Sequence, residues 1–412
     1  MKALVFGVDP QPWDDAPGTD APRLLQHLAA TPMALQDVAD PAPIGPDWVV
    51  LRTRMTGICG SDAKQVLMDF EGGDDNPMTA FISFPQVLGH EVVADVVEVG
   101  PEAKAEPGQR VVLNPWLSCG PRGIDPWCGP CQAGDLAMCE HFLDGRLSPG
   151  IHTGNCVEAT GGFAELLPAH DSMCIPVPEG LPDEVAVLAD PFAVSLHGIV
   201  RNPPPEGGRV LVYGMGALGT TAVAVLRALY PSVEIGVVAM WPAQRAMAER
   251  LGASRVLTPE PREELIEELA EWSGGVLRRP WGGLPVAYPG RIDVVYDTIG
   301  GYDTVEVGIR VLASRGTLVQ LGVNSPKRLE WTPIYFKELR WVGSSAFGVE
   351  DVDGVRRHAI AHYLDMAASG RVDLSGMLTH TFGLDDWRHA FTTIVEQGET
   401  GAIKVAFDFR TP

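Results

Sequence analysis

The feature that most restricts the fold is a glycine-rich turn between an apolar strand and a helix. Residues 209–219 read RVLVYGMGALG. Gly214 permits a tight turn, Gly216 lets the backbone approach a pyrophosphate, and Gly219 lets the next helix pack close to the strand. The free N–H groups at the start of that helix attract phosphate. The pattern therefore predicts a dinucleotide-binding unit.

Strand and helix patterns alternate beyond this turn, which predicts a parallel sheet covered by helices on both faces. The expected strands are 209–213, 233–240, 292–296, 317–322 and 340–343, and the expected helices are 217–230 and 243–251. Before about residue 190 the chain has short β-type runs at 48–55, 92–99 and 110–114, broken by Gly and Pro. Surface loops are expected at 9–32, 69–84 and 274–290, and a helix at 353–368.

The second strand of the dinucleotide unit lacks an expected acid. An acidic residue usually ends this strand and binds the adenosine ribose. The segment here reads VVAMWPAQR, with Ala239 or Met240 in that place, and Arg245 could meet a 2′-phosphate. The segment has no cluster of basic and hydroxyl residues, so NAD and NADP both remain possible.

Two groups of residues have the chemistry of metal sites. The four cysteines between 119 and 139, spaced C-x8-C-x2-C-x7-C, can close a tetrahedral zinc shell of structural type. Cys59 and His90 can supply two ligands of a catalytic zinc, and the third ligand is Glu91 or Asp190. The residues of the structural site are Cys119, Cys128, Cys131 and Cys139.

The motifs together resemble a known family. GICGSD, LGHE, the cysteine cluster, GGFAE and GMGALG stand in the order found in zinc-containing medium-chain dehydrogenases/reductases, such as alcohol, sorbitol and threonine dehydrogenases. The resemblance implies an α/β protein with a Rossmann doubly wound parallel sheet and a mainly β, GroES-like catalytic domain. The implied catalytic domain is 1–193 with 346–412, and the implied Rossmann domain is 194–345.

The resemblance also implies roles for single residues. Cys59, His90 and Asp190 would hold the catalytic zinc, with Asp190 where sorbitol dehydrogenase-like members use Glu, and Glu91 would be a nearby or exchanging ligand. Asp62 would orient His90 from the second shell. The PRGIDPW insert after Cys119 is longer than usual and is expected to loop out from the cluster.

The implied proton and cofactor contacts come from three further parts of the chain. Ser61 would take the alcohol proton, and Lys64 stands where many relatives place His at the outer end of the proton relay. Lys404 would lie against the cofactor pyrophosphate. The residues expected to contact the dinucleotide are Gly214, Gly216, Ala217, Leu218, Gly219, Arg245 and Lys404.

The expected function is reversible hydride transfer between a secondary alcohol, polyol or sugar and NAD(P), with zinc lowering the pKa of the alcohol. Two alternatives stay open: zinc-assisted dismutase or lyase chemistry with a tightly held, recycled nicotinamide, and a non-catalytic dinucleotide-binding protein. The net charge of −22 argues against nucleic-acid binding. No signal or membrane segment is seen in the sequence, so a cytoplasmic protein is expected. The resemblance implies a homodimer or homotetramer.

Overall fold

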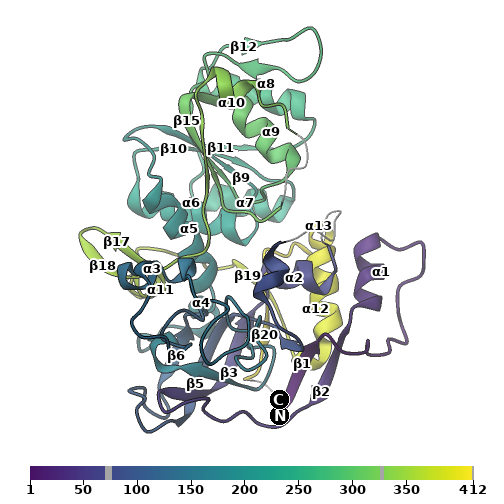
Figure 1. Cartoon of the computed structure of the whole chain (residues 1–412). Coiled ribbons are helices and arrows are strands. Elements are labelled where there is room, and N and C mark those ends of the chain that lie inside the picture. The colour runs from purple at the N-terminus through teal and green to yellow at the C-terminus, as the bar shows by residue number, and fades with distance from the viewer. Residues whose placement is uncertain (70–76, 325–328, 411–412) are drawn as a thin grey trace.

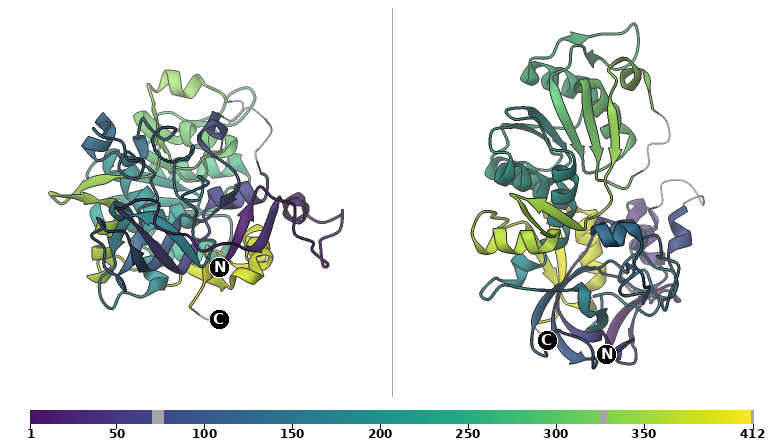
Figure 2. Two further views of the ribbon diagram at one scale, coloured as in Figure 1. Left: turned by 60° about the horizontal axis from the view of Figure 1, so that its bottom comes forward. Right: turned by 60° about the vertical axis from the view of Figure 1, so that its left-hand side comes forward.

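The computed structural model describes residues 1–69, 77–324 and 329–410. The chain forms two parts, one above the other in Figure 1, and both ends of the chain lie at the bottom of the lower part. The right-hand view in Figure 2 shows the same division, with a parallel sheet in the upper part. In the described residues, no helix combines the length and the apolar character needed to cross a membrane.

The upper part is built on a six-stranded parallel sheet. Its strand order corresponds to 3-2-1-4-5-6 in chain order, which is the doubly wound arrangement predicted from the sequence. From one edge to the other, the strands are β11 (Arg255–Leu257), β10 (Glu234–Val238), β9 (Arg209–Tyr213), β14 (Ile292–Asp297), β15 (Leu312–Gln320) and β16 (Arg340–Gly343).

The central strand β9 shows why this sheet has helices on both faces. Val210 and Val212 belong to one buried cluster, and Leu211 and Tyr213 belong to another on the opposite face. A continuous apolar run is therefore needed, because successive side chains point to opposite faces. The helices of this part are α6 (Ala217–Leu229), α7 (Pro242–Arg250), α8 (Arg262–Ser273), α9 (Tyr302–Val311) and α10 (Thr332–Phe336).

The lower part contains a seven-stranded sheet and a three-stranded sheet. The first consists of β19 (Leu378–Phe382), β20 (Lys404–Asp408), β3 (Trp48–Gly57), β5 (Glu91–Val99), β6 (Arg110–Leu113) and β8 (Cys174–Pro176), with β7 (Leu166–His170) also paired to β3. The second consists of β2 (Met33–Asp37), β1 (Lys2–Phe6) and β4 (Gln86–Val87). Because β20 pairs with β3, the C-terminal segment completes the sheet begun by the N-terminal half.

Helices of the lower part surround these sheets and reach the upper part. α5 packs against α6, which begins at the glycine-rich turn, and so connects the two parts. The helices are α1 (Arg23–Ala30), α2 (Gly60–Val66), α3 (Gly129–Ala133), α4 (Asp183–Ala186), α5 (Ala189–Arg201), α11 (Ala359–Ala368), α12 (Trp387–Val395) and α13 (Gln397–Thr400).

Two predicted loops contain regular structure. The prediction of a loop at 9–32 was wrong where α1 forms. Leu25 and Leu28, three residues apart, pack on α12 and stabilise this helix between flanks rich in Pro and Asp. The 274–290 loop contains a small antiparallel pair, β12 (Leu277–Arg278) and β13 (Val286–Ala287).

A third prediction placed a helix start too early, and a fourth lies partly outside the described residues. The helix predicted at 353–368 begins only at Ala359, because Asp353 and Gly354 have positive φ and turn a hairpin between β17 (Val349–Val352) and β18 (Val355–His358). Of the predicted loop at 69–84, residues 70–76 are not described, and η1 (Pro77–Phe81) is a short 3-10 helix.

Candidate active site and metal centres

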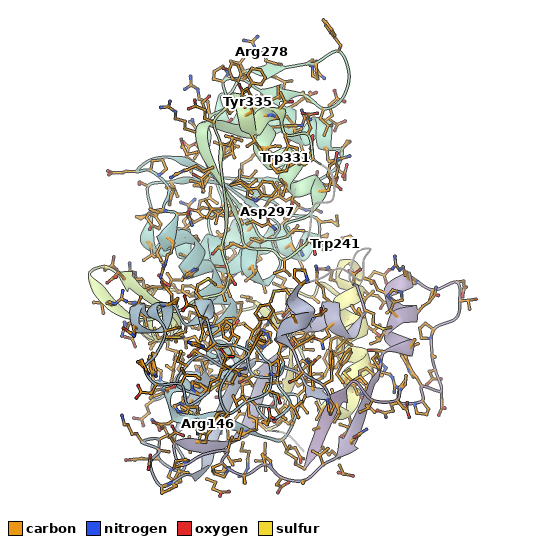
Figure 3. The ribbon with its side chains drawn as sticks, viewed as in Figure 1. Arg146, Trp241, Arg278, Asp297, Trp331 and Tyr335 are labelled. Carbon is orange, nitrogen blue, oxygen red and sulfur yellow. The ribbon has the colours of Figure 1, made fainter. Side chains whose placement is uncertain are left out.

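A single cavity of about 2130 Å³ lies between the two parts of the molecule. Its walls include the glycine-rich turn of the upper part and Cys59, His90 and Asp190 of the lower part. Trp241, labelled in Figure 3, lies where the upper part faces the lower one. Its ring packs on α13, since a Cβ added at Gly398 would come within 2.7 Å of it. The volume exceeds the 300–1,000 Å³ that is typical of small-ligand pockets, and it can hold a dinucleotide together with a substrate.

The glycine-rich turn has the geometry that its sequence predicts. Gly214 has φ +92°, and a Cβ there would come within 2.6 Å of Thr298 Oγ1. A Cβ at Gly219 would come within 2.0 Å of the Gly214 carbonyl oxygen. Gly216 has no atom within 4 Å of its Cβ position and borders the cavity, so that backbone can be approached by a phosphate. The first helical residues, Ala217 and Leu218, also line the cavity.

At the adenosine end of this cavity, the guanidinium of Arg245 in α7 binds a main-chain carbonyl of the wall. Ala239 is buried, and Met240 and Glu260 line the wall. The Arg245 guanidinium donates to the Met240 carbonyl oxygen at 3.0 Å. Among the described residues, Met240 lines the cavity and Arg245 does not. The contact of Arg245 with a 2′-phosphate stays a prediction.

The predicted catalytic metal ligands converge although they come from distant segments. Ligand atoms of Cys59, His90 and Glu91 all lie within 4.8 Å of one another. Cys59 precedes α2, and its N–H donates to Asp62 Oδ2 at 3.0 Å. Asp62 Oδ1 lies 3.5 Å from His90 Nδ1, which leaves Nε2 as the ring nitrogen available to a metal. Burial opposes protonation, but the charges of Asp62 and Cys59 outweigh it and raise the pKa of His90 well above its ordinary value.

Asp190 borders the same site from the first turn of α5. It is 5% exposed, and its Oδ2 atom is buried without a hydrogen-bond partner in the described residues. Burial is the main cause that raises its pKa to about 7, and the charge of Glu91 adds to it. A divalent cation would supply the missing partner. Asp190 is not part of the Cys59–His90–Glu91 cluster itself.

Lys404 differs from its expected position. Its ammonium group is buried, forms an ion pair with Glu91, and donates to the Ile58 carbonyl oxygen at 3.0 Å. The expectation placed this charge against the cofactor pyrophosphate, whereas the structure directs it to the metal site. The reason is β20, whose first residue, Lys404, lies next to β3 and therefore next to the ligand cluster.

Ser61 and Lys64 also line the cavity. Both belong to α2, and Ser61 is exposed. The Lys64 ammonium donates to Asn324 Oδ1, which follows β15 in the upper part. This contact joins the two walls of the cavity.

His152 is a cavity residue that sequence reasoning missed. Its ring centroid lies 4.5 Å from that of His90, and its ring meets Trp116 edge to face. Burial, with the positive charge of His90 as a second cause, lowers the pKa of His152 to about 3. No local motif marks this histidine, because its place in the site depends on pairing between residues far apart in the sequence.

The four predicted structural cysteines form a second buried group. Cys119, Cys128, Cys131 and Cys139 have ligand atoms within 4.8 Å of one another, apart from the catalytic cluster. The Sγ atoms of Cys119 and Cys139 are 3.7 Å apart. A tetrahedron with zinc–sulfur bonds of about 2.3 Å has an edge of about 3.8 Å, so this group fits a zinc ion.

The insert between the first two cysteines lies at the surface over most of its length, as expected, but its Arg122 turns inward, which the sequence did not predict. Its Arg122 is 0% exposed and donates five hydrogen bonds to main-chain carbonyl oxygens, at 2.7–3.1 Å. The guanidinium therefore holds together the segment 117–150, which contains the four cysteines and is called the cysteine lobe below. The five acceptors are the carbonyls of Leu117, Asp144, Leu147, Ser148 and Gly150.

Comparisons with known proteins agree with this arrangement. Residues 45–179 match the alcohol dehydrogenase GroES-like domain and residues 217–361 match the zinc-binding dehydrogenase domain, together about two thirds of the chain. An (R,R)-butanediol dehydrogenase of Saccharomyces cerevisiae is 28% identical over 381 residues, covering 88% of this chain and 92% of the relative. An L-galactonate-5-dehydrogenase of Escherichia coli is 28% identical, covering 87% and 89%.

Solved structures show the same fold over the whole chain. A zinc-binding dehydrogenase from Sinorhizobium meliloti, bound to NADP, has a TM-score of 0.69 at 26% identity and covers 91% of this chain and 96% of that chain. These matches confirm the family and the fold class predicted from the sequence. The chain belongs to the zinc-containing medium-chain dehydrogenases/reductases and is a zinc-dependent, NAD(P)-linked oxidoreductase.

Proposed function

We propose that this oxidoreductase interconverts a secondary alcohol or polyol and the corresponding ketone. The observation that carries the proposal is that one cavity holds both a dinucleotide-binding turn and a cluster of metal-ligating side chains. A protein that only binds a dinucleotide needs no Cys59, His90 and Glu91 cluster. The relatives that act on butanediol and galactonate favour a substrate with more than one polar carbon.

We assign the catalytic zinc to Cys59, His90 and Asp190, with Glu91 as the exchanging ligand. The unpartnered Oδ2 of Asp190 and the existing Glu91–Lys404 ion pair support this order. Zinc bound there supplies a Lewis acid that lowers the pKa of an alcohol oxygen. The Lys404 ammonium balances the charge of Glu91 through their ion pair, so that Glu91 competes less with substrate for the metal position left free.

The proton of the alcohol leaves through α2. Ser61 accepts the proton from the substrate hydroxyl while its own hydroxyl proton passes to solvent, and the charged Lys64 ammonium, on the same helix, lines the same cavity. Asn324 holds the Lys64 side chain by accepting its hydrogen bond. Asp62 keeps His90 in one orientation, which fixes the direction of the ring nitrogen that faces the metal.

The glycine-rich turn binds the pyrophosphate through the N-terminus of α6. Gly216, Ala217 and Leu218 present main-chain N–H groups to the cavity wall, and a cofactor of either type satisfies them. Glu260 at the adenosine end disfavours a 2′-phosphate by like charge, and we therefore propose NAD rather than NADP.

We further propose that two chains pair through the free edge of the parallel sheet. β16 is an edge strand, and Trp331, Tyr335 and Phe336 beside it are exposed aromatic residues (Figure 3 labels Trp331 and Tyr335). An unpaired strand edge and exposed apolar side chains are both covered in such a pairing.

The proposed domain limits are 1–193 with 346–412, and 194–345. All seven cysteines are free, which suits a reducing compartment such as the cytoplasm.

The deciding experiment measures reduced nicotinamide absorbance with purified protein, NAD or NADP, and a panel of primary, secondary and polyhydric alcohols. We expect activity with secondary alcohols and polyols, higher with NAD, and removed by a strong zinc chelator. Zinc should restore the activity. No oxidation of any alcohol by a protein with a full zinc content would overturn the proposal.

A further inference from the structure

We propose that His152 determines substrate specificity by accepting a hydrogen bond from a hydroxyl on the carbon next to the reacting carbinol. The favoured substrates are then vicinal diols, and α-hydroxy ketones in the reverse reaction. This inference rests on the proposed function and adds to it the position of the second hydroxyl.

The backbone holds His152 in a fixed place. Trp116 and His152 form an isolated antiparallel bridge. On one side the Leu117 N–H donates to the Ile151 carbonyl at 3.0 Å, and on the other the Thr153 N–H donates to the Pro115 carbonyl at 2.8 Å. The ring is therefore positioned by a paired segment and not by a freely moving loop.

The hydrogen bonds of the ring decide which nitrogen can accept. His152 Nδ1 lies 2.7 Å from the Thr153 carbonyl oxygen, which can only accept, so Nδ1 carries the proton. The other nitrogen, Nε2, then has a free lone pair. Within the described residues it makes no hydrogen bond, and His152 lines the cavity. The site thus presents an acceptor without a partner.

The location of this acceptor matches the second carbon of a substrate. The His152 ring packs against His90 with centroids 4.5 Å apart, and His90 is a proposed zinc ligand. A substrate whose carbinol carbon lies beside the cluster of Cys59, His90 and Glu91 would bring the hydroxyl of its next carbon towards the neighbouring His152 ring. Trp116 and Phe347 meet edge to face at 5.6 Å and form an apolar wall beside the ring. Carbon substituents of the substrate fit against that wall.

The acceptor discriminates because a substrate without the second hydroxyl leaves it unpaired. Closing substrate over His152 removes water from Nε2, and a monoalcohol gives no hydrogen bond in return. Sites built to bind a substrate hydroxyl reject analogues that lack it. We expect a preference of about tenfold to hundredfold for the diol, as kcat/KM, over the matching monoalcohol.

The experiment compares 2,3-butanediol with 2-butanol in the zinc-loaded enzyme and its variants. In His152→Phe, kcat/KM for the diol should fall about tenfold to hundredfold, while the value for 2-butanol stays within about threefold. In His152→Gln, the amide oxygen replaces Nε2 as acceptor and should restore part of the preference. His389→Phe, an exposed histidine outside the cavity, is the matched control and should leave the ratio unchanged.

A binding measurement separates this inference from the proposed function. Calorimetric titration of the zinc enzyme with reduced cofactor, in which neither alcohol can be oxidised, gives Kd for the diol and for the monoalcohol. If no alcohol is oxidised but His152→Phe abolishes tighter diol binding, the proposed function fails and the His152 assignment holds. An unchanged diol-to-monoalcohol ratio in His152→Phe overturns the assignment, and so does an equal loss for both alcohols. Failure of His152→Gln to restore any preference also overturns it.

Discussion

The cysteine lobe should depend on Arg122 more than on any surface charge near it. In Arg122→Met, five main-chain carbonyl oxygens lose their donor, three of them in fully buried hydrogen bonds. Each buried acceptor without a partner costs about 1–3 kcal/mol, and release of the buried charge offsets several kcal/mol of the sum. A net loss of about 3–5 kcal/mol remains, similar to breaking a buried ion pair.

The assay follows alkylation of the lobe cysteines by iodoacetamide, resolved peptide by peptide by mass spectrometry. When opening of the lobe is fast relative to alkylation, the labelling rate follows the open population. A loss of about 3 kcal/mol then raises the labelling rate at Cys119 and Cys131 about a hundredfold. The readout needs no catalytic activity, and folding of the rest of the chain is checked by circular dichroism.

Arg146→Met is the matched control. Arg146, labelled in Figure 3, lies at the same lobe, is about one third exposed, and is 3.4 Å from Asp47. Surface ion pairs contribute about 0–1 kcal/mol, so labelling should change less than about fivefold. If Arg122→Met labels its cysteines no faster than Arg146→Met, the guanidinium does not hold the lobe together and the reasoning fails.

Three further outcomes are expected. Cys59→Ala should lower turnover by at least about a thousandfold yet retain dinucleotide binding in a fluorescence titration; surviving activity would contradict the catalytic assignment. Lys404→Met should lower kcat/KM about tenfold to hundredfold with zinc content unchanged, because Glu91 loses its counter-charge and competes with substrate; normal kinetics would contradict this role. Burial, with Arg310 nearby, lowers the pKa of Lys337 to about 7 from 10.5. Between those values the unfolded chain binds the extra proton, so the free energy of unfolding should rise with pH by up to about 1.4 kcal/mol per unit in urea titrations. An equal rise with pH in the free energy of unfolding of Lys337→Met would contradict this prediction.

The doubly wound sheet could be predicted because its evidence is local. Burial on both faces requires continuous apolar strands such as RVLVY, and a helix N-terminus that approaches phosphate requires glycine at fixed positions. The cysteine cluster could also be predicted from the sequence, since its four residues lie within one short segment. Asp353 and Gly354 carried a hairpin signal that the expected helix at 353–368 overrode.

The missed contacts share a different physical origin. Arg122 looked like part of a polar insert, and its burial depends on carbonyls up to 28 residues away that turn inward around it. Lys404 reaches Glu91 only because β20 pairs with β3. His152 enters the active site through its bridge to Trp116. Contacts of this kind follow from how distant segments pair, which composition and spacing do not report.

The pairing of α5 with α6 explains how the two parts of the molecule can serve one reaction. Asp190 lies in the first turn of α5, at the proposed metal site, and one turn further Ser195 Oγ lies 2.7 Å from Thr221 Oγ1 of α6. Thr221 also donates to the Pro191 carbonyl at 3.0 Å. Because α6 begins at the glycine-rich turn, these buried hydroxyls fix the metal ligand relative to the dinucleotide. Hydride transfer needs reacting atoms about 3–3.5 Å apart, and a displacement of about 1 Å can cost a hundredfold in rate. Directional hydrogen bonds between the helices hold that distance more strictly than apolar packing alone, which tolerates sliding.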